Sequence, residues 1–268
     1  MTQKDFFEKI RSECSSNKEY ILELLKLRGF LFEEKTNGLI LSDNSHHSDA
    51  KYLDELFRRY NMGRLIQNEV VLSDGDCNEF INIEFREYNQ IAAPSCWQAR
   101  DWSWFKRIEY GRKAPVSCLE PYIARYIKAI SACGVFTVGS CDGNHPKCSK
   151  MIIMTEGEGS IPWHKLLCEK LLVDRFNINW TDDCAAMSFT DETKYATYYE
   201  VNKAAELLYM NRKEIRSVRS TALSGMTQSY FRNHTSEEIE KEFIGRAAEL
   251  IDGIELDEIT TPDDIAIN

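Results

Sequence analysis

We predict an α+β fold of two α-β-β-α-β-β halves in a pseudo-symmetric arrangement, followed by extra C-terminal helices, and three observations indicate it. Stretches with apolar residues on one helical face alternate with pairs of short apolar runs that are typical of strands. This order of elements occurs twice along the 268 residues. A glycine, Gly29 in the first half and Gly134 in the second, ends the helix that comes directly before the first strand pair of each half, which is its usual position at a helix end.

The chain is therefore expected to have four parts. These are an N-terminal α+β half at 1–95, a Trp/Arg-rich seam at 96–118, a second α+β half with a Cys/His loop at 119–214, and a basic ridge followed by an acidic C-terminal helix and tail at 215–268. The length is compatible with one large domain or two small ones.

In the first half, cap and turn residues mark where the elements begin and end. Asn17 is expected to cap a helix that stops at Gly29, and Ser48 to cap another. Asn37 followed by Gly38 between two apolar runs is a strong hairpin signal. The expected elements are helices over 2–14, 18–27 and 48–60 and strands over 30–34, 39–41, 69–72 and 80–85, the last two joined through 74–76.

The second half repeats this order. Pro162 falls in the first turn of its middle helix, where proline is tolerated. Residues 181–183 are polar and separate two apolar runs, which predicts a second hairpin. The expected elements are helices over 119–133, 160–175 and 192–214 and strands over 135–138, 151–154, 176–180 and 185–189.

The composition is that of an ordinary globular protein, with 43% hydrophobic and 28% charged residues. No run of 18 apolar residues occurs, so we expect no membrane partner. The first ten residues are charged throughout and lack the apolar stretch of a signal peptide, and nine cysteines occur without a C-x-x-C pair. A cytoplasmic location with reduced thiols is therefore expected.

The acidic net charge is concentrated at one end of the chain. Residues 236–268 hold eleven acids against two cations, Lys241 and Arg246, which accounts for most of the net charge of −10. The remaining body is nearly neutral, so an anionic partner for the body is not excluded.

The loop between the first two strands of the second half carries Cys141, His145 and Cys148 in the spacing C-x3-H-x2-C. Zinc binds such ligands when three or four converge, so zinc is a possible cofactor. A thiol at Cys141 activated by His145 is a second interpretation, which would make these two residues catalytic candidates. The third interpretation is a plain turn, for which residues 142–144 (Asp-Gly-Asn) are suitable.

Two segments carry candidate nucleic-acid- or phosphate-binding residues, because bases stack on rings and cations meet phosphates. The candidates are Arg100, Trp102, Trp104, Lys106 and Arg107 in the seam and Arg212, Arg216 and Arg219 at helical i, i+4, i+7 spacing. Tryptophans that fill the core between the halves are the alternative for the seam. For the arginines the alternatives are ordinary ion pairing, or masking by the acidic tail.

The sequence YILELLKLRGF at 20–30, continued by 48–60, resembles the LAGLIDADG endonuclease-like fold, and 126–135 is a second match. The resemblance implies a duplicated α-β-β-α-β-β-α unit whose concave sheet surface lies along a DNA duplex. In that family an acid directly before the helix-ending glycine holds the catalytic metal ion. Those positions are Arg28 and Cys133 here, so the catalytic acids are absent.

The function we expect is binding of nucleic acid or a nucleotide on a duplicated α/β scaffold, without standard nuclease catalysis. A zinc- or thiol-dependent enzyme using the Cys141, His145 and Cys148 loop is the alternative. A protein–protein interaction module, with a protein partner on the acidic C-terminal segment, is the second alternative. The sequence leaves open whether the chain is an enzyme.

Overall fold

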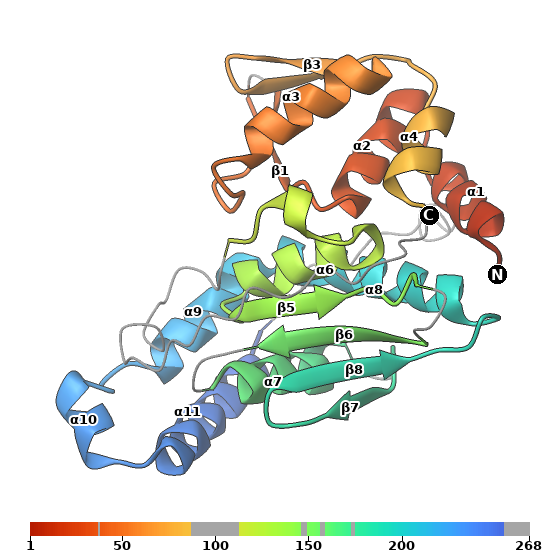
Figure 1. The fold of residues 1–268 in the computed structure, drawn as a ribbon. Coiled ribbons are helices and arrows are strands. Elements are labelled where there is room, and N and C mark those ends of the chain that lie inside the picture. Colours follow the sequence, from red (N-terminus) through yellow and green to blue (C-terminus); the bar gives the residue numbers. More distant parts are fainter. Residues whose placement is uncertain (37, 87–112, 146–148, 156–158, 173–174, 255–268) are drawn as a thin grey trace, which may run out of the picture.

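The computed structural model describes residues 1–36, 38–86, 113–145, 149–155, 159–172 and 175–254. Within these ranges the chain forms helices and two antiparallel four-stranded sheets, which confirms the α+β class (Figure 1). The first half lies at the top of Figure 1, and the second half with the C-terminal helices lies below it.

The first half begins with two short helices whose starts are fixed by side-chain caps. Thr2 forms a capping box with Asp5, and the Ser16 hydroxyl accepts a hydrogen bond from the Glu19 amide, so the second cap is Ser16 and not Asn17. The elements are α1 (Gln3–Ser12), α2 (Asn17–Leu27), β1 (Phe32–Lys35), β2 (Gly38–Leu41), α3 (Asp49–Tyr60), β3 (Gly63–Ile66), β4 (Glu69–Leu72) and α4 (Asn78–Glu84).

A short 3-10 turn, η1 (Val116–Cys118), leads into the second half. Its elements are α6 (Pro121–Ala132), β5 (Thr137–Cys141), β6 (Lys150–Thr155), α7 (Ser160–Leu171), β7 (Ile178–Trp180) and β8 (Cys184–Ser188). The C-terminal helices follow as α8 (Lys194–Met210), α9 (Arg212–Ala222), α10 (Gln228–Asn233) and α11 (Ser236–Ile251).

Both sheets have the same strand order. It is β1-β2-β4-β3 in the first and β5-β6-β8-β7 in the second. Each sheet consists of two hairpins joined through their second and fourth strands, with Ile40 opposite Glu69 in one and Ile153 opposite Ala185 in the other. The predicted repetition of α-β-β-α-β-β is therefore confirmed at the level of topology.

Helix α6 is the centre of the core. All of its residues except Arg125 are buried, and it packs against α8, α2 and β5. Gly29, directly after α2, lies so close to α6 that a Cβ added there would be 2.8 Å from the Ala124 Cβ, and its φ of +104° also requires glycine. The first half therefore packs directly on the opening helix of the second.

Two buried ion pairs accompany this packing. The Lys128 ammonium of α6 donates to the Asp49 carboxylate of α3 at 2.6 Å, and both side chains are only 1% exposed. The Arg28 guanidinium lies 3.4 Å from the Glu84 carboxylate, with exposures of 4% and 8%. Arg28 also donates to the carbonyls of Val116 and Leu119, so this network joins the halves.

Two expected elements of the chain differ in the structure, and one strand, β3, is not among the expected elements. Residues 80–84 belong to helix α4, which ends before Phe85, and not to a strand, because Phe80 and Glu84, one helical turn apart, face inward together. The hairpin partner of β4 is β3, and the turn between them uses Gln67 and Asn68, whose φ angles are 50° and 72°. No glycine marks this turn in the sequence. The expected helix over 192–214 breaks at the buried Asn211, between α8 and α9.

Candidate functional site

The described residues of the Cys/His loop, 141–145, are buried or half-buried. Cys141 ends β5 with 7% exposure, and its sulfur accepts a hydrogen bond from the Gly143 amide at 3.4 Å. His145 is half-buried, and Cys148 lies outside the described residues. Within the described ranges no three His, Cys, Asp or Glu side chains gather closely enough to hold a metal ion.

The turn residues of this loop brace the start of α6. The Asp142 carboxylate is 1% exposed and accepts hydrogen bonds from the amides of Asn144 at 2.7 Å and Tyr122 at 3.3 Å. The Asp142 amide in turn donates to the Glu120 carboxylate at 2.6 Å. Burial, together with the Glu120 charge, raises the pKa of Asp142 to about 7. These contacts give the Asp-Gly-Asn turn a packing role.

The five seam candidates, Arg100, Trp102, Trp104, Lys106 and Arg107, lie outside the described residues. The three arginines of the expected ridge are on α9, but they do not share one exposed face. Arg219 is 5% exposed and lies over the Phe243 ring of α11, 5.9 Å from its centroid. Burial lowers the pKa of Arg219 to about 10. Arg216 is half-buried, and Arg212 turns towards the first half.

Arg28 and Cys133, the residues that come directly before the helix-ending glycines, lie near opposite ends of α6. Arg28 bonds to carbonyls that precede α6, whereas Cys133 directly follows its last residue. At a rise of about 1.5 Å per residue, the length of α6 separates them by roughly 18 Å. The Cys133 thiol donates to the Leu208 carbonyl at 3.4 Å, and burial raises its pKa to about 12, so it is held as a neutral thiol.

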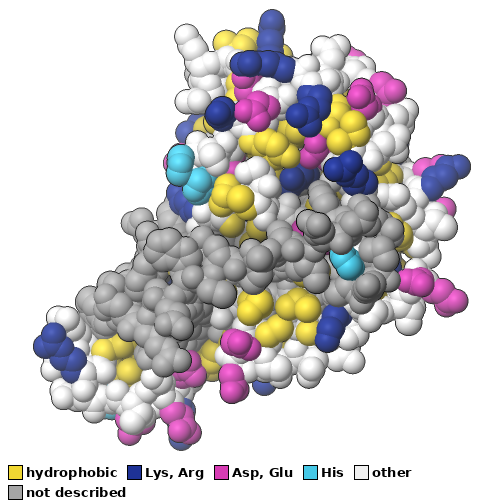
Figure 2. Space-filling model, in the orientation of Figure 1, with side chains coloured by type: hydrophobic (Ala, Val, Ile, Leu, Met, Phe, Trp, Pro, Cys, Tyr) yellow, Lys and Arg dark blue, Asp and Glu magenta, His cyan; other side chains and the backbone are white. Residues whose placement is uncertain are grey.

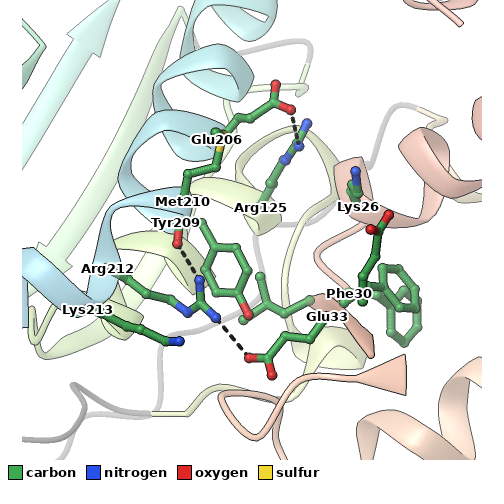
Figure 3. Close-up of a pocket in the computed structure, with 12 residues that line it drawn as sticks. Lys26, Phe30, Glu33, Arg125, Glu206, Tyr209, Met210, Arg212 and Lys213 are labelled. Carbon is green, nitrogen blue, oxygen red and sulfur yellow. Dashed lines mark hydrogen bonds and ion pairs between the residues drawn. The ribbon is translucent and has the colours of Figure 1, made fainter. Parts of the chain in front are cut away.

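A pocket at the junction of the halves is a candidate site among the described residues. Its volume is about 440 Å³, which is in the range of roughly 300–1,000 Å³ found for small-molecule sites. Figure 3 shows α8 and α9 on one side of it and β1 and the end of α2 on the other. The lining residues are Lys26, Phe30, Leu31, Phe32, Glu33, Glu34, Arg125, Glu206, Tyr209, Met210, Arg212 and Lys213.

Arg125 and Arg212 reach this pocket from different helices. The Arg125 side chain, 12% exposed, lies 3.2 Å from the Glu23 carboxylate and 3.6 Å from that of Glu206. The Arg212 side chain, 11% exposed, donates to the Glu33 carboxylate at 2.9 Å and to the Tyr209 carbonyl at 2.8 Å (Figure 3).

Arg212 also lies against the aromatic ring of the pocket. Its guanidinium is 4.1 Å from the centroid of the Tyr209 ring, a cation–π distance. The Nε–H of Arg212 is buried and has no hydrogen-bond partner among the described residues. A buried donor without a partner is costly, so this arginine has capacity for one further acceptor.

Glu33 is held as a carboxylate in this arrangement. Burial alone would raise its pKa, but the hydrogen bond from Ser42 and the charge of Arg212 lower the pKa overall. The Ser42 hydroxyl donates to Glu33 Oε1 at 2.6 Å, the same oxygen that meets Arg212. The pocket therefore holds arginines already neutralised by internal carboxylates.

Of the lining residues, only Arg212 was a candidate from the sequence. The others come from residues 26 to 213 of the chain, and no spacing motif joins them. One available signal was Arg125, a cation in the otherwise largely apolar stretch that becomes α6.

No protein-family model, curated protein or solved structure matches the chain. No helix in the described part of the chain has both the length and the apolar composition needed to cross a bilayer.

Proposed function

We propose that the chain binds a phosphate-bearing ligand of nucleotide size in the pocket at the junction of its halves. The observation that carries the proposal is the convergence of Arg125 and Arg212, both largely buried, beside the ring of Tyr209. Guanidinium groups match phosphate oxygens in geometry and charge and are stronger partners when shielded from water.

The mixed charge of the lining favours a nucleotide over a simple anion. Lys26 and Lys213 add positive charge for a phosphate, while the Glu206 carboxylate offers an acceptor for ribose hydroxyls or base amino groups. Carboxylates recognise ribose hydroxyls in this way in dinucleotide-binding folds. The Tyr209 ring supplies an apolar surface for a base.

A nucleic-acid polymer is less well supported by the described surface. Binding a phosphate chain needs a strip of cations. On the face shown in Figure 2, Lys and Arg are interspersed with Asp and Glu over the described part of the first half, at the top of the view. Of the arginines expected to form the ridge, Arg219 is buried and Arg212 lines the pocket.

The test is calorimetric titration with the four nucleoside monophosphates and with inorganic phosphate, at low salt. We expect binding of at least one nucleotide, and a loss of about tenfold or more in Arg125→Gln and Arg212→Gln, since a charge-assisted hydrogen bond contributes about 1.5–3 kcal/mol. Lys213→Gln, an exposed lining position, provides a milder variant that leaves the packing intact.

Arg175→Gln is the matched control, because Arg175 pairs with Glu200 at 3.5 Å on the surface and does not line the pocket. It should bind as the wild type does. The proposal fails if no nucleotide binds, or if all three pocket variants retain wild-type affinity. Binding of single-stranded oligonucleotides with steep salt dependence, without mononucleotide binding, would support the polymer and overturn the pocket.

A further inference from the structure

The Arg212–Glu33 pair is an internal contact across the junction of the halves. Arg212 is the first residue of α9, and Glu33 lies on β1, an edge strand of the first sheet. The two groups are 2.9 Å apart, and both line the pocket. A carboxylate of one half therefore forms an ion pair with a guanidinium of the other half.

We infer that Glu33 is an internal competitor of the ligand, whose carboxylate occupies the phosphate position on Arg212 until an anion displaces it. This inference rests on the proposed function of the pocket. Phosphate and carboxylate oxygens make the same type of hydrogen bond with a guanidinium, so one replaces the other without a change in donor geometry.

The position of Glu33 permits this exchange. Its side chain is 27% exposed, compared with 11% for Arg212, so the carboxylate can turn to water while the guanidinium remains shielded. The contact that holds Glu33 from its own half is the Ser42 hydroxyl, at 2.6 Å, and β1 has a neighbouring strand on one side only. Displacement carries no desolvation penalty for the Glu33 carboxylate, because this group moves towards solvent.

The Arg212 guanidinium needs a counter-ion both with and without ligand. This group is largely buried, and a buried charge without a counter-ion is strongly destabilising. The exchange therefore replaces one counter-ion with another. Affinity for the external anion is reduced by the free energy of the internal pair, which sets a threshold concentration for binding.

The experiment compares Glu33→Gln with Glu34→Gln by titration with AMP and, separately, inorganic phosphate. Glutamine keeps the length and volume of the side chain and removes the charge. Glu34 is the matched control because it lines the same pocket, neighbours Glu33 in sequence and is exposed. We expect Glu33→Gln to bind at least one probe about tenfold more tightly than the wild type, and Glu34→Gln to change affinity by less than about threefold.

The effect of AMP on the difference in unfolding temperature between Glu33→Gln and the wild type is a readout that a merely structural role would not change. Without ligand, Glu33→Gln should unfold at a lower temperature than the wild type, because Arg212 has lost its counter-ion. With AMP the difference should shrink, since the bound phosphate restores it. Ser42→Ala, which removes the hydrogen bond to Glu33 and keeps both charges, should shift affinity in the same direction by a smaller factor.

The outcomes separate the two proposals. If the wild type binds AMP and the Glu33 and Glu34 variants do not differ, internal competition is wrong and the pocket remains a nucleotide site. If neither the wild type nor Glu33→Gln binds any nucleotide or phosphate, the proposed function itself is wrong. If Glu33→Gln does not fold, the Ser42→Ala affinity decides, and an unchanged value overturns the inference.

Discussion

Lys128→Met tests whether the buried pair with Asp49 stabilises the junction of the halves. Methionine keeps the length and bulk of the lysine stem but cannot neutralise the carboxylate, whose side chain is 1% exposed. Removing one partner of a buried pair costs about 3–5 kcal/mol, because the other charge stays buried without compensation.

The lower end of that range applies here. After the substitution, the Asp49 carboxylate still accepts hydrogen bonds from the amides of Val116 and His46, each at 2.9 Å. The Ala114 carbonyl loses the lysine donor, which lies at 2.7 Å. We therefore expect the free energy of unfolding to fall by about 3 kcal/mol.

Guanidinium denaturation followed by circular dichroism measures this loss. Lys51→Met is the control, because Lys51 lies on the same helix as Asp49, is 84% exposed and is 4.0 Å from Glu55. It should change stability by no more than about 0.5 kcal/mol. A loss below about 1 kcal/mol in Lys128→Met would show that water or a rearranged partner reaches the carboxylate, and would refute the reasoning.

The remaining predictions concern two glycines and a buried carboxyl. Gly29→Ala should destabilise the protein by about 2 kcal/mol or more, because the φ of Gly29 is +104° and α6 leaves no room for a Cβ. Gly245 lies in α11 with open space around it, so Gly245→Ala should stabilise the protein by up to about 1 kcal/mol. Thermal unfolding of both variants measures these changes. The pKa of Asp142 is raised above its unfolded value of 3.8 to about 7, so the folded state binds more protons and stability should fall as pH rises between those values. In Glu120→Gln this fall should be smaller, since the second-largest cause of the shift is removed; denaturation across pH 4 to 8 measures it, and identical slopes in the two proteins would contradict it.

Local signals in the sequence were sufficient for much of the fold. The dipeptide at 37–38 predicts the first hairpin, and Gly29 and Gly134 predict the helix ends. The structure gives Gly29, Gly38 and Gly134 positive φ angles, which favour glycine. The hairpin at Gln67 and Asn68 was missed because non-glycine residues adopt the same conformation there. Helix α4 was missed because its apolar residues alternate as in a strand.

The pocket could not be predicted from the sequence for a different reason. Glu33 and Arg212 are 179 positions apart and meet only through the packing of α6 between the halves. Spacing motifs describe residues that lie on one element or one loop, and no such motif covers a contact made by tertiary structure. The Cys/His loop, in contrast, has a conspicuous spacing motif because its residues are close in sequence. In the structure, Asp142 of this loop accepts a hydrogen bond from the Tyr122 amide and so contributes to packing.

The burial of α6 has a consequence for how the chain unfolds. A helix with only Arg125 reaching solvent cannot lose its first-half neighbours without exposing apolar surface to water, so the two halves should unfold in one cooperative transition. Amide hydrogens of α6 should then exchange only through global unfolding, and a ligand bound at Arg125 would slow that exchange across the entire helix.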